Sequence, residues 1–460
     1  MDDTPAATEG AAAAPQFRRP YAPDHDVLLQ IKNPHRPGRL GLLLTVIGEV
    51  GGLVSEITTR FVGRDAMLRD LTVSVYDEEH LEELLRAIPG RTEAQVLGVK
   101  DLVFERHLGG KIHCGRTKEL AGLEDLRLVY TPGVARVCRA IRDEPALARR
   151  YTTAGRTVGI FTNGTRVLGL GDIGALASMP VMEGKAVLYD QFAGLSAVPV
   201  LVDERDPAAF VETVMRVAPT FAGIHLEDIR TPDCFEIEDA LIARLDKPVM
   251  HDDQHGTATV LLAAVLSALR ETGRGLAPAD WRKAARGLTC AQIGLGAAGL
   301  AIARLLIEYG FRVLGVDPSP DARARLESHG GTIADLEDAI AAADVLIATT
   351  GVVGLIRPES IRTGQIVLAL SNPVPEIRPS EAIAAGAAFA ADGQSVNNAL
   401  AFPGLFRAAI DTGAPAITGP MKTAAAEAIS VLADPGELVP SPFHPEVHQQ
   451  VVAAAAGAAV

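Results

Sequence analysis

Two adjacent carboxylates stand between two histidines in the stretch VMHDDQHGTATV, residues 249–260. Asp252 and Asp253 are flanked by His251 and His255, and an apolar run follows at once. Such acids can cap a helix, because a carboxylate at a helix start accepts backbone N–H groups and complements the helix dipole. The alternative is a metal site, which needs more oxygen ligands from elsewhere in the chain.

A second acid pair, Glu227 and Asp228, follows the apolar stretch VAPTFAGI, a strand candidate. Asp252 and Asp253 likewise end the strand candidate KPVMHDD. The carboxyl ends of parallel strands meet at one edge of a sheet, where ligands bind in open α/β folds. Converging carboxylates suit a hard divalent cation, Mg²⁺ or Mn²⁺. The two histidines leave zinc open, but oxygen ligands dominate, so we expect the imidazoles to position neighbours or pack in the core.

The dinucleotide fingerprint G-x-G-x-x-G occurs twice. In the second copy, Gly294, Gly296 and Gly299 open an unbroken helical run, and the strand FRVLGVD then ends on Asp317. This order predicts a βαβ unit that holds the pyrophosphate at a helix N-terminus and the ribose at the acidic residue.

The first copy contains Gly169, Gly171 and Gly174. Pro180 and Gly184 follow within a few residues, and a proline there removes a backbone donor and disrupts the helix. We therefore assign the dinucleotide to the second copy and interpret the first as a tight strand-to-helix turn.

Composition excludes several classes of function. With 48% hydrophobic and 22% charged residues the chain is typical of a soluble globular protein. Its net charge of −14 makes nucleic acid and membrane surfaces poor partners. The longest apolar run, 257–269, is shorter than the roughly 20 residues of a membrane span. The four cysteines form no C-x-x-C, which favours a reducing cytoplasm over a zinc ribbon or a disulfide framework.

The N-terminal quarter reads as a unit of its own. Residues 1–23 are acidic and rich in Ala and Pro, without a signal peptide, and we predict a disordered tail. Residues 26–105 then follow the order βαββαβ, which is ferredoxin-like. The second helix, EEHLEELLRAIPG, is predicted to stop at Pro89-Gly90, and AQVLGVKDLVFE (94–105) is predicted to be the last strand. With NPHRPGRLG at the first βα turn, this stretch resembles an ACT domain, a module that senses small ligands and often pairs edge to edge. A plain dimerisation or packing module remains the alternative.

Beyond residue 108, strand-like and helix-like segments alternate, which predicts an α/β fold with parallel sheets. We divide the chain into a tail (1–23), an ACT-like regulatory domain (24–108), a substrate and metal domain (109–255), and a Rossmann-type dinucleotide-binding domain with C-terminal helices (256–460).

Six segments in order resemble the malic enzyme family, in its shorter bacterial form. They are LVYTPGVARVC, VLGLGDIGALASMPVMEGKAVLYDQFAG, HLEDI, HDDQHGTATV, SNPVPEI and NNALAFPGLFRAAI. One departure is AADGQSVNN, where short bacterial members usually carry a longer segment before NNALAFPG.

The resemblance implies a role for each matching residue. Glu227, Asp228 and Asp253 fall on the family's metal ligands. Lys185 matches the general base, Asp252 its acidic neighbour, and Tyr130 the general acid. Asn372, Asn398 and Arg166 match substrate-binding positions, although bacterial relatives vary at the last.

The implied reaction is the oxidative decarboxylation of malate to pyruvate and CO₂, with NAD⁺ as cofactor, NADP⁺ as the alternative, and Mg²⁺ or Mn²⁺ as the metal. Asp317 favours NAD⁺, because a carboxylate accepts hydrogen bonds from the ribose 2′-OH and repels a 2′-phosphate. The expected partners are malate, a small effector at the ACT-like domain and further copies of the chain in a homodimer or larger homo-oligomer. Two alternatives stay open: a 2-hydroxy-acid dehydrogenase without decarboxylation, and an ACT-headed ligand sensor with an inactive catalytic half.

Overall fold

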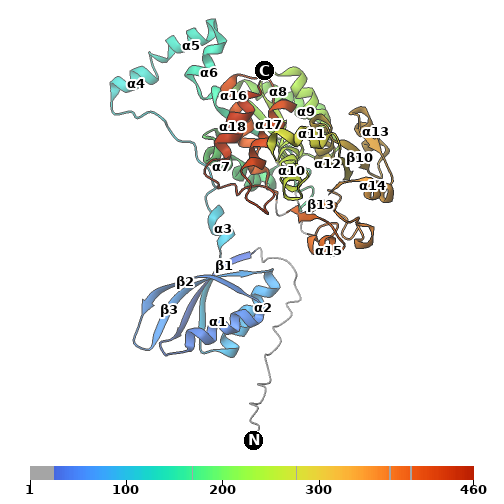
Figure 1. Cartoon of the computed structure of the whole chain (residues 1–460). Coiled ribbons are helices and arrows are strands. Elements are labelled where there is room, and N and C mark those ends of the chain that lie inside the picture. Colours follow the sequence, from blue (N-terminus) through green and yellow to red (C-terminus); the bar gives the residue numbers. More distant parts are fainter. Residues whose placement is uncertain (1–24, 168, 276, 372–373, 394–395, 460) are drawn as a thin grey trace. The chain divides into compact units, whose positions relative to one another are not determined.

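The structure is a computed structural model that describes residues 25–167, 169–275, 277–371, 374–393 and 396–459. The chain forms two compact units, Met1–Lys111 and Ile112–Val460 (Figure 1). The tail predicted over 1–23 lies outside the described residues. The predicted boundary at 255/256 falls inside the second unit and stays a prediction. Within the described ranges, every helix is too short or too polar to cross a bilayer.

The first unit has the predicted βαββαβ order. Its elements are β1 (His25–Pro34), α1 (Arg39–Val50), β2 (Leu53–Val62), β3 (Ala66–Val75), α2 (Glu78–Arg91) and β4 (Gln95–Asp101). The strands pair antiparallel in the order β2-β3-β1-β4. Alternate residues of β1 and β3 are buried with one face of each helix in a separate hydrophobic core. This core explains why the unit is compact by itself.

Two details of this unit differ from the expectation. The predicted helix stop at Pro89-Gly90 is wrong, because α2 continues to Arg91. The last predicted strand ends early and is followed by a helix, α3 (Leu102–His107). The Asp101 carboxylate accepts the backbone N–H groups of two residues in the first turn of α3. These hydrogen bonds cap the helix and favour it over a continued strand.

The second unit contains two parallel sheets. The smaller comprises β5 (Thr157–Thr162), β6 (Ser196–Leu201), β7 (Gly223–Leu226) and β8 (Val249–His251), in the order β6-β5-β7-β8. The larger comprises β9 (Thr289–Ile293), β10 (Arg312–Val316), β11 (Thr332–Ile333), β12 (Val345–Ala348), β13 (Ile366–Ala369) and β14 (Phe389–Asp392), in the order β11-β10-β9-β12-β13-β14. Parallel sheets confirm the predicted α/β class.

The helices of this unit are α4 (Leu123–Val129), α5 (Val134–Asp143), α6 (Ala148–Tyr151), α7 (Met179–Ala193), α8 (Pro207–Val217), α9 (Asp233–Arg244), α10 (Asp252–Glu271), α11 (Trp281–Ala285), α12 (Ala297–Tyr309), α13 (Pro320–Ser328), α14 (Leu336–Ala342), α15 (Pro379–Ala384), α16 (Phe402–Thr412), α17 (Gly419–Val431) and α18 (Val447–Gly457). Short 3₁₀ turns are η1 (Pro145–Leu147), η2 (Thr153–Gly155), η3 (Leu176–Ser178), η4 (Ala218–Thr220), η5 (Pro278–Asp280), η6 (Pro358–Ser360) and η8 (Asn398–Leu400).

The apolar run after the acid pair is the central helix of the second unit. From Ala258 to Leu269, every residue of α10 is buried, and the helix packs against α12 and α17. A helix that is apolar all round must be covered on all sides. The acids that begin α10 are therefore attached to a helix that is buried on all sides.

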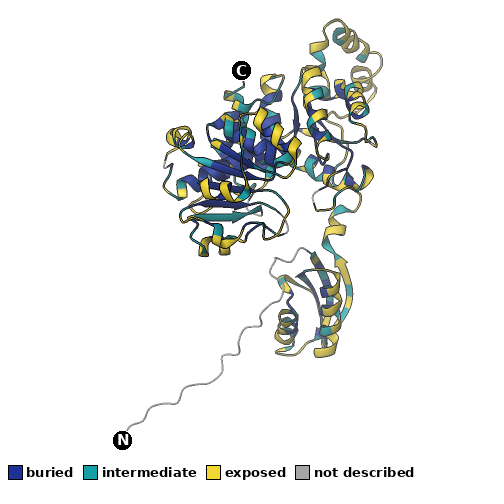
Figure 2. Ribbon diagram, turned by 90° about the vertical axis from the view of Figure 1, so that its right-hand side faces the viewer, coloured by how far each residue is buried: buried dark blue, intermediate teal, exposed yellow. Residues whose placement is uncertain are grey.

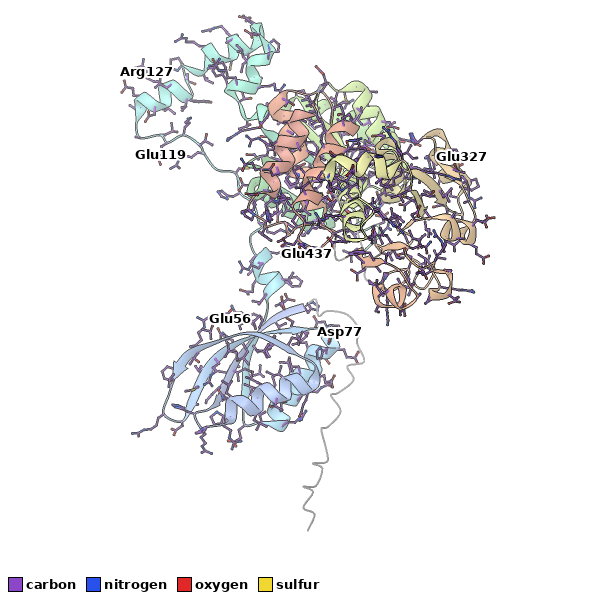
Figure 3. The ribbon with its side chains drawn as sticks, viewed as in Figure 1. Glu56, Asp77, Glu119, Arg127, Glu327 and Glu437 are labelled. Carbon is purple, nitrogen blue, oxygen red and sulfur yellow. The ribbon has the colours of Figure 1, made fainter. Side chains whose placement is uncertain are left out.

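Residues 113–156 form an arm that stands off from both sheets (Figure 1). Its helices α4, α5 and α6 contain no buried residue, and in Figure 2 the arm is largely exposed. The labelled side chains of Glu119 and Arg127 lie on it, away from the sheets (Figure 3). At its base, Arg149 donates a hydrogen bond to the Ile410 carbonyl in α16.

Candidate metal and catalytic site

The two acid pairs converge as predicted, because they follow neighbouring parallel strands. Leu226, the last residue of β7, is in register with His251, the last residue of β8. Glu227 comes directly after β7, and Asp252 is the first residue of α10. The strand ends therefore place both pairs at the same edge of the sheet.

Three carboxylates form the candidate cation site. Single oxygens of Glu227, Asp228 and Asp253 lie within 4.8 Å of one another. The Asp228 backbone N–H also donates to Asp253 Oδ2 at 2.9 Å. Glu227 and Asp228 are buried, whereas the Asp253 side chain is 35% exposed. A buried set of oxygen donors with one exposed member fits Mg²⁺ or Mn²⁺.

The backbone is strained at one of these residues. Among the residues described, Asp228 is the only non-glycine with a positive φ, 55°. Such a conformation persists when its surroundings impose it, and it clusters at functional sites. The Asp228 carbonyl accepts the Arg166 backbone N–H at 3.0 Å, which fixes this turn. The Arg166 side chain itself is exposed, and its predicted role toward substrate stays a prediction.

Lys185 lies between two buried acids. Its Nζ is 2.5 Å from Asp252 Oδ2 and 3.1 Å from Glu227 Oε1. Asn398 Nδ2 donates to the same Asp252 oxygen at 2.7 Å. The ammonium also lies 4.7 Å from the centre of the Phe402 ring. Three predicted site residues, Lys185, Asp252 and Asn398, are thus brought together.

The predicted partnership of Asp252 with Lys185 is present, while the capping alternative is not. The N-cap of α10 is His251, without a side-chain cap, and both acids lie in the first turn. Asp252 Oδ1 is buried and has no hydrogen-bond partner among the described residues.

Charge and burial oppose each other at this cluster. Burial would lower the pKa of Lys185, but the carboxylates of Asp252 and Glu227 outweigh it and raise that pKa above its ordinary value. Burial raises the pKa of Glu227 to about 8 and that of Asp252 to about 6, while Lys185 acts in the opposite direction on both. Lys185 is therefore the counterion of the acids, and it can become a base only when another cation takes over that role.

The helix that carries Lys185 corrects one expectation. Pro180 does not disrupt it, because α7 begins at Met179 and the proline stands in the first turn, where a missing N–H costs nothing. Gly184 lies inside the same helix. The first glycine fingerprint comes before the turn η3 and does not open a helix. It joins a strand to a helix as predicted, but within a long connection from β5 rather than a tight turn.

The two histidines beside the acid pair are not in the carboxylate clusters that could hold a cation within the described ranges. His255 Nε2 is 3.1 Å from Glu238 Oε2, and its Nδ1 is 3.1 Å from Lys422 Nζ. Glu238 also accepts the His251 backbone N–H at 2.7 Å. The contacts of His255 support its predicted positioning role. The His251 ring nitrogens have no hydrogen-bond partner among the described residues, and its Nε2 lies 3.3 Å from Asp253 Oδ2.

Sequence reasoning missed two buried residues, Tyr189 and His225. Tyr189 OH is 2.9 Å from His225 Nδ1, and His225 Nε2 is 2.5 Å from Glu227 Oε2. The signal was present in the spacing. Tyr189 is four residues after Lys185 on a helix, and His225 is two before Glu227 along a strand, so each pair shares a face.

The second fingerprint forms the predicted βαβ unit from β9, α12 and β10. Gly294 has φ 91°, and a Cβ on Gly299 would lie 2.0 Å from the Gly294 carbonyl oxygen. Gly296 caps α12, and nothing lies within 4 Å of the point where its Cβ would be, so a ligand can approach there. Asp317 follows β10, and its carboxylate accepts the N–H groups of Leu295 and Ser319.

Two predicted site residues, Asn372 and Tyr130, cannot be counted with the cluster, for different reasons. Asn372 lies outside the described residues. Tyr130 follows α4 on the arm with 65% of its surface exposed, and its role as the general acid stays a prediction. The spacing of motifs carries no information about which copy of a chain supplies a residue.

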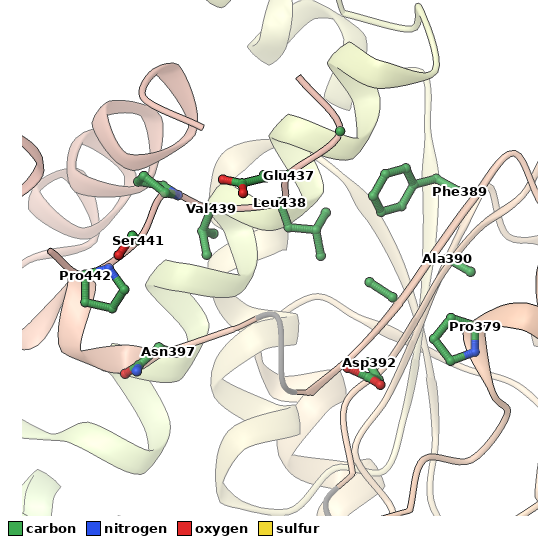
Figure 4. A pocket seen from close by; sticks show the side chains of 13 residues that line it. Pro379, Phe389, Ala390, Asp392, Asn397, Glu437, Leu438, Val439, Ser441 and Pro442 are labelled. Atoms are coloured by element: carbon green, nitrogen blue, oxygen red, sulfur yellow. The ribbon is translucent and has the colours of Figure 1, made fainter. Parts of the chain in front are cut away.

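A cavity of about 570 Å³ lies behind the turn that holds Asn398. Its walls include Asn397, Phe389, Asp392 and Glu437 (Figure 4). The side chain of Asn397 accepts the Ala399 N–H and so shapes this turn. The cavity and the carboxylate site thus contact adjacent residues of one short loop.

Comparison with known proteins agrees with this site. The family model "Malic enzyme, N-terminal domain" matches residues 110–208, and the model "D-isomer specific 2-hydroxyacid dehydrogenase, NAD binding domain" matches residues 262–352. The second match contains the second fingerprint and the strand that ends before Asp317.

Relatives match nearly the whole chain. NAD-dependent malic enzyme 1 of Bacillus subtilis is 49% identical over 435 residues, which cover 94% of this chain and 97% of the relative. The crystal structure of malic enzyme from Pyrococcus horikoshii is 38% identical with a TM-score of 0.71, covering 78% of this chain and 90% of that one. An NAD-dependent malic enzyme structure from Thermotoga maritima is 36% identical with the same TM-score, covering 78% and 99%. With its converging acids, its buried lysine and its dinucleotide fold, the chain belongs to the malic enzyme family.

Proposed function

We propose that this protein oxidises malate with NAD⁺ and decarboxylates the product to pyruvate and CO₂ in the presence of Mg²⁺ or Mn²⁺. The observation that carries the proposal is Lys185 held between Asp252 and Glu227, beside the three-carboxylate site. A potential base and a cation site at one sheet edge are what the oxidation of a 2-hydroxy acid requires.

Each of these residues then has a chemical task. A cation held by Glu227, Asp228 and Asp253 would supply Lewis acidity toward the substrate oxygens, and NAD⁺ would accept the hydride. Neutral Lys185 takes the proton of the C2 hydroxyl, and Asp252 orients it through their 2.5 Å contact. Loss of CO₂ from oxaloacetate leaves an enolate, and Tyr130 donates a proton to its C3 to give pyruvate.

Product analysis tests this function. With malate, NAD⁺ and Mn²⁺, we expect NADH, pyruvate and CO₂ in equal amounts. Oxaloacetate without CO₂ would instead identify a 2-hydroxy-acid dehydrogenase. Absence of turnover in a folded, Mn²⁺-binding protein would favour the ligand-sensor alternative.

We propose NAD⁺ as the preferred cofactor. Asp317 lies at the end of β10, where a carboxylate faces the ribose 2′-OH in this fold. Arg323, which could attract a 2′-phosphate, is instead bound to the Asp317 carbonyl oxygen. We expect a higher kcat/KM with NAD⁺ than with NADP⁺ at saturating malate and Mn²⁺, and a smaller ratio in Asp317→Ala. A higher value with NADP⁺ in the wild type would refute this preference.

We infer that the protein is a homodimer or larger homo-oligomer in which a second copy supplies Tyr130. The arm exposes many apolar side chains: Leu120, Leu123, Leu126, Leu128, Val129 and Val137. Helices without buried residues cannot offset the entropy of their own ordering, and exposed apolar surface of this kind marks an interface. On α7 and the turn before it, Leu176 and Val181 are also exposed, just ahead of Lys185. A reciprocal exchange of arms would cover both surfaces.

Mixed dimers test this exchange. Tyr130→Phe and Lys185→Ala should each be nearly inactive, because the first lacks the C3 proton donor and the second lacks the base. When the two variants are co-expressed, mixed dimers regain one intact site, and activity should return to about a quarter of wild type at random assortment. If the activity after co-expression did not exceed the sum of the activities of the two variants, Tyr130 would act within its own chain.

For the first unit we propose a regulatory role, with a small anion as effector. Arg69 in β3 is 9% exposed and lies on the same strand face as the buried Leu71. Its guanidinium donates to the side chains of Asn33 and Met67, neither of which is charged, and no carboxylate lies within ion-pair distance of it among the described residues. A buried cation without a counterion favours an anionic ligand. With succinate as a probe, turnover at low malate should change in the wild type and not in Arg69→Gln; equal responses would contradict the assignment.

The inference of a cytoplasmic location rests on the cysteines. All four are free thiols, two of them buried. This is consistent with a reducing compartment.

A further inference from the structure

A line of three buried side chains leads to one of the proposed metal ligands. Tyr189 and His225 are fully buried, and Glu227 is 3% exposed. The Tyr189 hydroxyl lies 2.9 Å from His225 Nδ1, and His225 Nε2 lies 2.5 Å from Glu227 Oε2. The line starts on α7, crosses β7 and ends at the cation site.

The partners of the imidazole assign its tautomer. The fully buried ring has one partner at each nitrogen, and a neutral imidazole carries a single N–H. When Glu227 is ionised to bind a cation, its carboxylate can only accept, so Nε2–H donates to it. Nδ1 then accepts the hydrogen bond of the Tyr189 hydroxyl. The phenol is the group that keeps the proton on the nitrogen facing the metal ligand.

Aromatic rings hold this line in place. The Tyr189 ring packs edge-on against Phe402 and Phe406, with centroids 5.0 and 5.8 Å away. The His225 ring lies 5.4 and 5.8 Å from the same two rings. Because α16 supplies both phenylalanines, the imidazole cannot rotate without moving the core. Rigid packing of this kind fixes the direction of the hydrogen bond to Glu227.

The two oxygens of Glu227 are held from opposite sides of the cluster. Oε2 accepts from His225, and Oε1 faces Lys185 Nζ at 3.1 Å. When Lys185 gives up its charge to act as a base, the bond from His225 is the remaining fixed contact of this carboxylate among the described residues.

We propose that Tyr189 and His225 are positioning residues that set the orientation in which Glu227 binds the divalent cation. This inference rests on the proposed function, because it takes Glu227 as a metal ligand. Hydrogen-bond partners of metal ligands commonly change metal affinity by about 10- to 100-fold when they are removed.

The test is Mn²⁺ binding to the full-length protein without malate or NAD⁺, measured from the electron paramagnetic resonance signal of free Mn²⁺. Tyr189→Phe removes one hydroxyl and keeps the ring packing, and we expect Mn²⁺ affinity to fall by about tenfold. At saturating Mn²⁺ its kcat should return toward the wild-type value. His225→Leu should weaken binding further, and His225→Gln, which keeps an N–H donor, should restore part of it.

The matched control is Tyr309→Phe. Tyr309 is also buried and donates to a carboxylate, Glu427, at 2.8 Å, but on α12 and away from the cluster. Its Mn²⁺ affinity should equal that of the wild type. Equal affinity of Tyr189→Phe and wild type, or an equal loss in both tyrosine variants, would overturn the positioning role. Asp253→Asn distinguishes an error in the positioning role from an error in the proposed metal site. If Asp253→Asn also left Mn²⁺ binding unchanged, the metal site itself would be wrong.

Discussion

Asp253→Asn is expected to lower kcat/KM for malate by at least about a hundredfold while the fold is retained. The asparagine keeps the shape of the side chain and can still accept the Asp228 N–H, so the strained turn stays in place. What is lost is one anionic oxygen of the three that converge on the cation. Loss of a ligand should cost at least as much as the 10- to 100-fold typical of its hydrogen-bond partners.

Steady-state kinetics over a range of Mn²⁺ concentrations measure this effect. The control is Asp246→Asn, which makes the same chemical change at an exposed residue between α9 and β8. The control should behave as wild type. Wild-type turnover and an unchanged Mn²⁺ dependence in Asp253→Asn would remove this residue from the metal site.

Lys185→Ala is expected to reduce kcat by about 10²- to 10⁴-fold, the usual contribution of a general base. The variant leaves Asp252 and Glu227 without their ammonium, but the pKa of Glu227 is already raised to about 8 by burial, so this acid can take up a proton instead. The cluster therefore stays folded without the lysine, and the loss should lie in the proton transfer.

Rates of NADH formation at saturating malate and Mn²⁺ give the size of the loss, and the exposed Lys283→Ala is the matched control. A small primary amine such as methylamine should restore part of the rate in Lys185→Ala and none in Asp253→Asn. If Lys185→Ala oxidised malate at the wild-type rate, another group would have to be the base.

Much of the site could be predicted because its residues follow regular elements. Glu227 comes directly after β7 and Asp253 two residues after the end of β8, and the rule that strand ends share a sheet edge places them together. The second fingerprint likewise has a local cause, since Gly299 must lack a side chain to pass the Gly294 carbonyl. These features depend on neighbours in sequence or on one general rule of topology.

The remainder depends on contacts that sequence spacing does not encode. Pro180 lies in the first turn of a helix rather than ending one, because the turn η3 directly precedes α7. Asp101 caps α3 where a strand was expected. Tyr130 lies in the matching motif VYTPGV, yet its side chain is exposed on the arm. The link from Tyr189 through His225 to Glu227 joins α7 to β7, and only the packed structure brings these elements together.

The position of Lys185 between Asp252 and Glu227 also links two equilibria. One carboxylate, Glu227, contacts the Lys185 ammonium and also belongs to the candidate cation site. Each of the two positive charges therefore weakens the interaction of the other with Glu227. By thermodynamic reciprocity, a cation that favours loss of the lysine proton is itself bound more tightly once that proton has gone, by the same factor. Metal binding to the acid cluster and deprotonation of Lys185 are thus coupled, and each favours the other.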